Sequence, residues 1–363
     1  MRRLFAGMAA ALLAAVLFFP VSATSADSYI LMDATTGRIL EQKNSSNRAL
    51  IASTTKIMTA LIVCEQSNVL DRVRIPKEAV GIEGSSIYLK EGEVLTVQEL
   101  LYGMMLHSGN DAATALAIYC GGTVGGFVQL MNDKVRDLGL TGTRFANPHG
   151  LDASDNYSTA ADLAVLTAYA MENPIFAKTV STKSIKISGR SLRNHNKLLW
   201  VLDGADGVKT GYTRAAGRIL VSSATRQGRR LICVTISAPD DWNDHKVLME
   251  RGFSEFDVCQ LIADGQVIAS AEVAGGQAGT ADLVAAEDFS YSIAKEEKIT
   301  IVPPVQMFVY APVVKGAFAG YATICLNGTP VGKVKLVYAQ TIEQQEYADK
   351  KPRFKLLMNG GAQ

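Results

Sequence analysis

A serine and a lysine stand three residues apart where an apolar run begins. The segment "IASTTKIM" at residues 51–58 contains Ser53 and Lys56. Residues i and i+3 lie on one face of a helix, so a helix here would bring the hydroxyl within hydrogen-bond reach of the amine. A hydroxyl next to a neutral amine is the minimum for an activated nucleophile. The pair therefore predicts nucleophilic catalysis by Ser53.

The residues that follow this serine predict a buried helix. The run "KIMTALIVCE" is apolar nearly all round, which is typical of a helix inside a core. Ser53 would lie at the N-terminal end of that helix, where backbone amides and the helix dipole favour developing negative charge. Burial would also lower the pKa of Lys56, which must be neutral to act as a base.

Two further motifs follow in a specific order. The segment "HSGND" places Ser108 and Asn110 on either side of a glycine, and "GVKTGYT" contains Lys209, Thr210 and Gly211. The order S-x-x-K, S-x-N, K-T-G is that of the penicillin-recognising serine enzymes. The combination is far more specific than any one of the three motifs.

With these motifs the chain resembles the low-molecular-mass penicillin-binding proteins that act as D-alanyl-D-alanine carboxypeptidases. The segments "NPHGLD" at residues 147–152 and "YSTAADLAVL" from Tyr157 are also similar to that family's sequence between the second and third motifs. The resemblance covers almost the whole chain after the leader. It implies an exported enzyme of peptidoglycan biosynthesis that removes the terminal D-alanine from stem peptides and is acylated by β-lactams.

The resemblance also implies roles for individual residues. Ser53 would attack the carbonyl carbon of the penultimate D-alanine, Lys56 would take its proton, and Ser108 would relay a proton to the departing amine. Positive charge on Lys209 would help to lower the pKa of Lys56. No metal or organic cofactor is needed for this chemistry. The residues expected to bind substrate are Asn110, Lys209, Thr210, Gly211 and Tyr212, with the N–H groups of Ser53 and Tyr212 as the oxyanion hole.

The expected fold class is α/β (α+β). A penicillin-binding/β-lactamase-like transpeptidase domain, with a mixed sheet and a helical layer, would be followed by a small all-β C-terminal domain. The second domain is indicated by short β-rich segments with an Asn327-Gly328 hairpin turn. The expected divisions are a signal peptide at 1–26, a catalytic domain at 27–255, a β-rich domain at 256–345 and a tail at 346–363.

The first 26 residues predict export. Arg2 and Arg3 precede an apolar stretch, and "SATSA" offers cleavage after Ala23 or Ala26. The alternative is an uncleaved membrane anchor, because the stretch is near spanning length. We expect an extracytoplasmic protein in the cell wall or periplasmic space, and the basic and apolar tail leaves a peripheral membrane contact open.

The charge balance points away from nucleic acid. The chain has 36 Lys and Arg against 35 Asp and Glu, and only two arginines belong to the leader, so 34 basic side chains remain against 35 acidic ones. Five widely spaced cysteines without a C-x-x-C pair argue against a zinc site or a disulfide framework. Several lie in apolar runs and are expected to be buried.

Several other polar residues were weighed for catalysis. His107 adjoins Ser108, but neighbours on an extended chain point to opposite sides. Asp111 is expected to cap the helix that follows it. Arg193 and Arg214 are candidates for binding the substrate carboxylate. The remaining histidines show no metal-ligand spacing and are expected in loop or structural roles; they are His149, His195 and His245.

Other functions remain open at this point. A class A β-lactamase would need a glutamate for deacylation, and only Glu172 lies between the second and third motifs. A catalytically idle cell-wall binding protein would keep the fold, but no motif residue is missing. Cleavage of D,D-crosslinks by an endopeptidase would use the same site chemistry.

Overall fold

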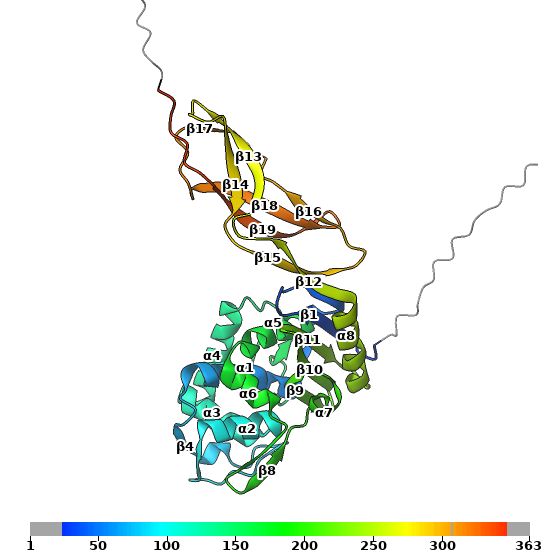
Figure 1. The fold of residues 1–363 in the computed structure, drawn as a ribbon. Coiled ribbons are helices and arrows are strands. Elements are labelled where there is room, and N and C mark those ends of the chain that lie inside the picture. Colours follow the sequence, from blue (N-terminus) through cyan, green and yellow to red (C-terminus); the bar gives the residue numbers. More distant parts are fainter. Residues whose placement is uncertain (1–23, 306–307, 347–363) are drawn as a thin grey trace, which may run out of the picture. The chain divides into compact units, whose positions relative to one another are not determined.

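The computed structural model describes residues 24–305 and 308–346, which divide into two compact units (Figure 1). The first unit contains residues 24–35 and 39–250, and the second contains residues 36–38 and the described part of 251–346. The apolar part of the predicted signal peptide and nearly all of the predicted tail lie outside the described residues.

The first unit is built on a five-stranded sheet in the order β2-β1-β11-β10-β9. Each neighbouring pair is antiparallel, so the expectation of a mixed sheet was wrong in that detail. Antiparallel neighbours can be joined by short connections, and a turn at Gln227-Gly228 joins β10 to β11. The strands are β1 (Ser28–Asp33), β2 (Ile39–Lys43), β9 (Ala205–Thr213), β10 (Gly217–Arg226) and β11 (Arg229–Ile236).

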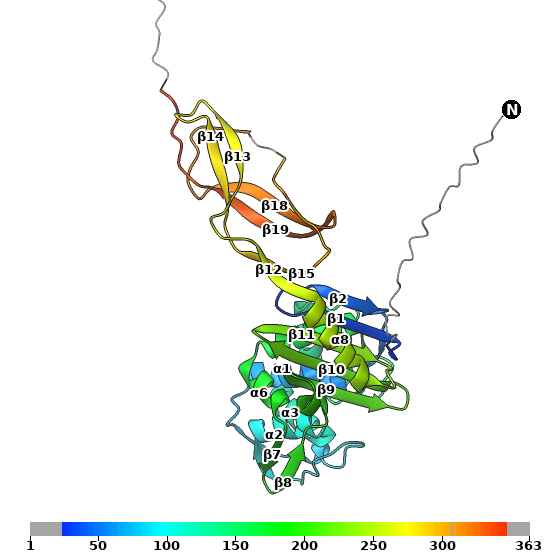
Figure 2. The same ribbon diagram turned by 45° about the vertical axis from the view of Figure 1, so that its right-hand side comes forward.

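Helices cover both faces of this sheet (Figure 2). On one face α1 lies at the centre of the helical layer, and its residues from Lys56 to Cys64 are all buried, as the apolar run predicted. On the other face lies α8. The helices are α1 (Lys56–Gln66), α2 (Val97–Leu106), α3 (Asn110–Gly121), α4 (Val124–Asp137), α5 (Ala160–Met171), α6 (Pro174–Ser181), α7 (Leu198–Val201) and α8 (Asp241–Glu255).

Short elements connect these layers. The α2 helix begins with a capping box, in which Thr96 accepts from the backbone of Glu99 and the Glu99 carboxylate accepts from the backbone of Thr96. The 3-10 turns are η1 (Ala52–Thr55) and η2 (Lys77–Ala79). Three small hairpins or strand pairs are formed by β3 (Ala49–Leu50) with β6 (Tyr157–Ser158), β4 (Arg72–Arg74) with β5 (Val94–Thr96), and β7 (Ser184–Ile187) with β8 (Arg190–Arg193).

The second unit is all β. Its six-stranded sheet has the order β16-β18-β19-β14-β13-β17, and β12 pairs separately with β15. The predicted turn at Asn327-Gly328 joins β18 to β19, and both residues have positive φ, as a type I′ hairpin requires. The strands are β12 (Phe256–Ile262), β13 (Val267–Ala274), β14 (Thr280–Ala285), β15 (Phe289–Ala294), β16 (Ile299–Val302), β17 (Phe308–Tyr310), β18 (Phe318–Leu326) and β19 (Thr329–Tyr338).

The five cysteines are free thiols. Cys64, Cys233 and Cys325 are buried, as their apolar surroundings predicted. Within the described residues no single helix has the length and apolar character needed to cross a bilayer; α3 and α4 pass on those two criteria only as a pair bent by 83°.

Candidate active site

Ser53 lies in the 3-10 turn η1, which leads directly into the buried helix α1. The preceding residue, Ala52, has a φ of +44°, a backbone conformation that residues with a Cβ rarely adopt. Thr54 closes the turn, because its backbone N–H and its hydroxyl both donate to the carbonyl of Ile51. The turn presents the half-buried Ser53 at the N-terminal end of α1.

Lys56 lies three residues further on and is completely buried. Its Nζ is 3.0 Å from Ser53 Oγ, 2.7 Å from Asn110 Oδ1 and 2.5 Å from the backbone oxygen of His149. Burial lowers the pKa of Lys56 well below its ordinary value, and the positive charge of Lys209 lowers it further, while Asp111 opposes both. The burial and the neighbouring positive charge that were expected to lower the pKa of Lys56 are therefore both present.

The three polar atoms around the Lys56 amine determine the direction of each hydrogen bond. A neutral lysine amine has two hydrogens and one lone pair. The carbonyl oxygens of Asn110 and His149 can only accept, so they take the two hydrogens. The lone pair is then left for the hydroxyl hydrogen of Ser53, which is the arrangement required of a general base.

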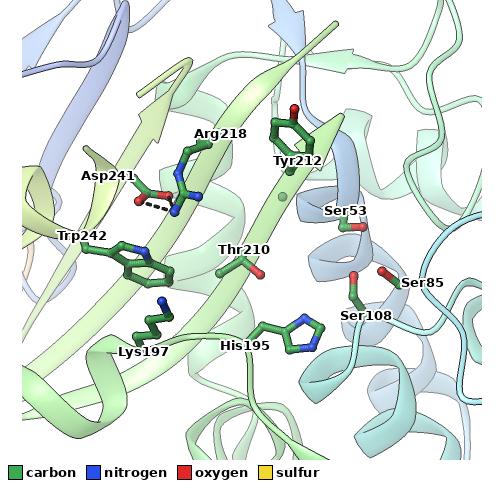
Figure 3. Close-up of a pocket in the computed structure, with 11 residues that line it drawn as sticks. Ser53, Ser85, Ser108, His195, Lys197, Thr210, Tyr212, Arg218, Asp241 and Trp242 are labelled. Carbon is green, nitrogen blue, oxygen red and sulfur yellow. Dashed lines mark hydrogen bonds and ion pairs between the residues drawn. The ribbon is translucent and has the colours of Figure 1, made fainter. Parts of the chain in front are cut away.

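Ser108 and Asn110 come from the sharp connection between α2 and α3. Ser108 is buried and has a φ of +63°, and its hydroxyl points toward Ser53 (Figure 3). The Asn110 side chain accepts from Lys56 and donates from Nδ2 to the carbonyl of Glu83 at 2.6 Å. Asn110 thus positions the base, a role that sequence reasoning had not given it; its second Nδ2 hydrogen is what remains for substrate.

The third motif lies on β9, the edge strand next to the nucleophile. Lys209 is buried, which lowers its pKa to about 7, and its Nζ donates to the carbonyl of Thr210 at 2.8 Å. A Cβ at Gly211 would stand 3.3 Å from Ser53 N, so glycine allows the strand to pass close to the nucleophile. Tyr212 is exposed beside them. An edge strand of this kind can pair with an extended peptide.

The segment 147–152 supports the catalytic turn from behind. It supplies the His149 carbonyl to Lys56, and Thr59 on α1 donates to the carbonyl of Pro148. At Gly150 the φ is +89°, and a Cβ there would lie only 1.9 Å from the backbone oxygen of Ala52. Glycine is required at this position both for the backbone conformation and for the close approach.

A cavity of about 340 Å³ opens beside these groups (Figure 3). Arg218 lies in it, with Nη2 at 2.7 and 3.0 Å from the two carboxylate oxygens of Asp241. The buried Nε of Arg218 has no hydrogen-bond partner within the described residues. Trp242 stacks between Arg218 and Lys197, each 5.9 Å from its ring. The lining residues are Ser53, Ser85, Ser108, His195, Lys197, Thr210, Gly211, Tyr212, Arg218, Asp241 and Trp242.

The pocket thus contains an arginine that sequence reasoning missed. Of the two arginines that were proposed, Arg214 is exposed on the turn after β9, and Arg193 stacks on Trp200 in a neighbouring cavity. The signal for Arg218 was the hairpin itself, because β9 and β10 pair Tyr212 with Arg218.

The histidines take different positions. His107 caps the end of α2 with its ring 5.0 Å from that of His195, and it does not line the pocket of Ser53. Burial lowers the pKa of His195 to about 4, and burial with the charge of Lys56 does the same for His149. His245 is in the core, where Ser222 and Thr235 bond to its two ring nitrogens.

Two acidic residues, Asp111 and Glu172, bear on expectations from the sequence: the first on helix capping, the second on the β-lactamase alternative. Asp111 is not the N-cap of α3, which is Gly109, but its carboxylate does accept from the backbone N–H of Ala112 in the first turn of that helix. The same buried carboxylate accepts from the backbone of Ile87 and Leu89 and fixes the segment beside Ser85. Glu172 ends α5, is 79% exposed and lies 3.7 Å from Arg230. It is not among the pocket residues, so it cannot serve as the glutamate of a class A β-lactamase.

Metal chemistry has no candidate in the described part of the chain. Residues 24–305 and 308–346 contain no group of three or more His, Cys, Asp or Glu side chains placed to hold a metal ion.

Two family profiles match the chain. The D-alanyl-D-alanine carboxypeptidase family matches residues 18–240, and the penicillin-binding protein 5 C-terminal domain matches residues 256–344. The first match corresponds to the α/β unit that holds the three motifs, and the second corresponds to the all-β unit.

Individual relatives match over most of their length. D-alanyl-D-alanine carboxypeptidase DacF of Bacillus subtilis is 33% identical, over 84% of this chain and 83% of its own. The corresponding enzyme DacC of Escherichia coli is 33% identical, over 89% and 86%. The crystal structure of penicillin binding protein 5 from Haemophilus influenzae superimposes with a TM-score of 0.78 at 31% identity and covers 89% of this chain and 98% of its own.

Proposed function

The chain belongs to the D-alanyl-D-alanine carboxypeptidase family and is a serine-type D-Ala-D-Ala carboxypeptidase, and we propose that Ser53 is the serine that carries the acyl group. The family implies substrates ending in D-Ala-D-Ala and penicillin binding. Peptidoglycan stem peptides are the substrates that we assign to this site, and β-lactams are its covalent inhibitors.

Acylation begins with proton transfer from Ser53 to Lys56. The Ser53 oxygen bonds to the carbonyl carbon of the penultimate D-alanine, and the oxygen of that carbonyl takes the negative charge. The backbone N–H groups of Ser53 and Tyr212 stabilise this charge. The C–N bond then breaks, and Ser108 passes the proton from Lys56 to the departing amine. The terminal D-alanine leaves with its own carboxylate.

Deacylation returns the enzyme to its starting state. Water attacks the ester carbonyl while neutral Lys56 accepts a proton from it, and the Ser53 oxygen leaves and recovers a proton. Asn110 and the His149 carbonyl keep the amine in place through both steps. No cofactor takes part in either step.

The leaving D-alanine carries a carboxylate, and the pocket has cations to bind it. We assign this role to Arg218 together with Lys209 and Thr210. Asp241 fixes the Arg218 guanidinium in place, and the Arg218 side chain is still 42% exposed, so substrate can reach it. A guanidinium binds a carboxylate through paired hydrogen bonds, so it favours a peptide with a free C-terminus over one that continues.

Export follows from the same function. The substrate is outside the cytoplasm, and the leader-like residues 1–26 predict transport to the cell wall or periplasmic space. We propose that the enzyme acts there; a peripheral membrane contact of the C-terminal tail is part of the proposal and concerns residues beyond 346.

The observation that carries the assignment is the contact of Lys56 with Ser53, Asn110 and the His149 carbonyl. An N-acylated peptide ending in D-Ala-D-Ala tests it. The wild type should release one D-alanine per peptide, Ser53→Ala should release none, and Ser67→Ala, at the far end of the same helix, should match the wild type. D-alanine release by Ser53→Ala at the wild-type rate would overturn the assignment.

A further inference from the structure

The first described residues of the chain are bound to the start of α8. The backbone N–H of Ser25 lies 3.0 and 3.1 Å from the two carboxylate oxygens of Asp244, and its hydroxyl donates to Asp244 Oδ2 at 2.6 Å. The backbone N–H of Asp240 in turn donates to Ser25 Oγ at 2.9 Å. Ser25 is therefore held by the turn that begins α8.

The next residue is part of the core. Ala26 is 1% exposed, and its carbonyl accepts a hydrogen bond from Lys43 Nζ at 2.9 Å. The regular pairing of β1 with β11 begins only at Ser28. We call Ser25 and Ala26, with their partners Asp244 and Lys43, the N-terminal latch.

Asp244 depends on this latch. The residue is 5% exposed, and among the described residues the hydrogen bonds that its carboxylate accepts come from Ser25. A buried carboxylate without donors is strongly destabilising, because it has lost its water and gained nothing in return. A mature protein without Ser25 would deprive Asp244 of these hydrogen bonds.

The sequence alone allows the leader to be removed after Ala23 or after Ala26, since a small residue precedes each bond. The two products differ at the latch. Cleavage after Ala26 deletes Ser25 and Ala26. Cleavage after Ala23 keeps both and creates a charged amino group on Thr24, one residue from Ser25 and its acidic partner. An ammonium beside a buried carboxylate adds a favourable interaction.

We propose that signal peptidase hydrolyses the Ala23–Thr24 bond, and that Thr24 is the mature N-terminus and completes the latch. Water adds across the peptide bond, so that Ala23 takes the carboxylate and Thr24 the amine. This inference goes beyond the proposed function, since it rests on the predicted leader and the latch contacts and not on the reaction.

The latch and the active-site pocket each use a residue from the first turn of α8. Asp241, which holds Arg218 in the pocket, belongs to the same first helical turn as Asp244. The core bonds of His245 attach this helix to the sheet independently of the N-terminus. Loss of the latch should therefore loosen the first turn of α8 without unfolding the unit.

The first test uses the full chain with its own leader, expressed in a bacterium that exports it. N-terminal sequencing and intact mass of the processed protein should give Thr24 as the first residue. A first residue of Asp27, or a chain that retains Met1 after export, would overturn the proposal.

The second test measures the latch itself. Chains that begin at Thr24 or at Asp27 are released from a fusion whose protease leaves no extra residue. The shorter chain should melt roughly 5 °C lower. In an Asp244→Ala background the same trimming should lower the melting temperature by clearly less, because one of the two latch partners is already gone and only the contact of Ala26 with Lys43 is left to lose. Asp27→Asn, which removes an exposed carboxylate outside the latch, is the matched control and should leave the effect of trimming unchanged.

The second test compares the loss of melting temperature on trimming in the wild type with the loss in Asp244→Ala. Equal losses on trimming in the wild type and in Asp244→Ala, or no loss in either, would overturn the latch. Ser25→Ala removes the hydroxyl but keeps the backbone donor, and it should give an intermediate fall in melting temperature.

Discussion

The Nζ of Lys56 lies 2.5 Å from the backbone oxygen of His149, which is 93 residues away in the chain. The contact matters because a backbone carbonyl accepts and never donates. With Asn110 Oδ1 as the second acceptor, both hydrogens of the neutral amine are used, and its lone pair is directed to Ser53. Burial and the nearby charge of Lys209 lower the pKa of Lys56, and this favours the neutral form that catalysis needs.

Lys56→Arg tests whether this amine must lose its proton. Arginine keeps the positive charge but cannot be deprotonated in a protein. The acylation rate with benzylpenicillin, followed by intact mass, should fall by about 1,000-fold, which is within the range of general-base effects. Lys178→Arg, at an exposed position on α6, should leave the rate unchanged. Acylation of Lys56→Arg within tenfold of the wild type would contradict a base role for Lys56.

Gly150→Ala tests the close approach of segment 147–152 to the catalytic turn. The added methyl group would need the space occupied by the Ala52 carbonyl, so the segment must move and withdraw the His149 oxygen from Lys56. We expect a loss of acylation rate of about 100-fold. The matched variant is Gly139→Ala, where φ is also positive, at +67°, but no atom lies within 4 Å.

The two glycine variants distinguish the effect of backbone strain, which both share, from the displacement of segment 147–152, which only Gly150→Ala should cause. Gly139→Ala should lower the free energy of unfolding by about 1 kcal/mol through backbone strain alone and leave acylation at the wild-type rate. If both variants lose the same fraction of acylation rate, the contact between Gly150 and Ala52 is not what positions Lys56.

Arg218→Gln tests recognition of the substrate carboxylate. For a peptide ending in free D-alanine, kcat/KM should fall by roughly 10- to 100-fold, because a charged hydrogen-bonding partner is lost. For the same peptide with a C-terminal amide, kcat/KM should change less than about threefold. Arg214→Gln, on the exposed turn, should affect neither peptide. Equal losses for the acid and the amide would remove Arg218 from carboxylate binding.

His245 gives a prediction for stability in acid. Burial lowers its pKa to about 3 in the folded state, against about 6.5 in the unfolded chain. Between these values the unfolded chain binds a proton that the folded chain does not, so the free energy of unfolding must fall as the pH falls from 6.5 toward 3. One such group contributes about 1.4 kcal/mol per pH unit in this window.

His245→Gln keeps groups that can bond to Ser222 and Thr235 but removes the titration. Urea unfolding at pH 7 and at pH 4.5 should show a smaller loss of stability for the variant than for the wild type. His149 and His195, whose pKa values are both lowered to about 4, contribute in the same direction in both proteins. An equal loss in the two proteins would show that His245 does not titrate in this way.

The parts of the site that the sequence predicted are those that lie in short motifs. The spacing of Ser53 and Lys56 specified a helical face, and the apolar run after them specified burial, so the contact and the low pKa of the lysine could be inferred together. The hairpin turn at Asn327-Gly328 was also predicted, because turn residues are a local signal.

The parts that were missed depend on long-range packing or on backbone atoms. The His149 carbonyl carries no side-chain signature, and sequence reasoning had treated His149 only as a ring. Arg218 and Asp241 meet across two different elements, β10 and α8. Because helix α8 has no strong apolar pattern in its first turn, no local signal indicated that Asp241 lies near the nucleophile.

The assignment of Ser53 is tested most directly by locating the penicilloyl group. After reaction with benzylpenicillin, tryptic peptide mapping should place one adduct on residues 49–56, "ALIASTTK", whose one serine is Ser53. Ser53→Ala should form no adduct and release no D-alanine from a peptide ending in D-Ala-D-Ala. An adduct on a peptide containing Ser108, or D-alanine release without Ser53, would contradict the account.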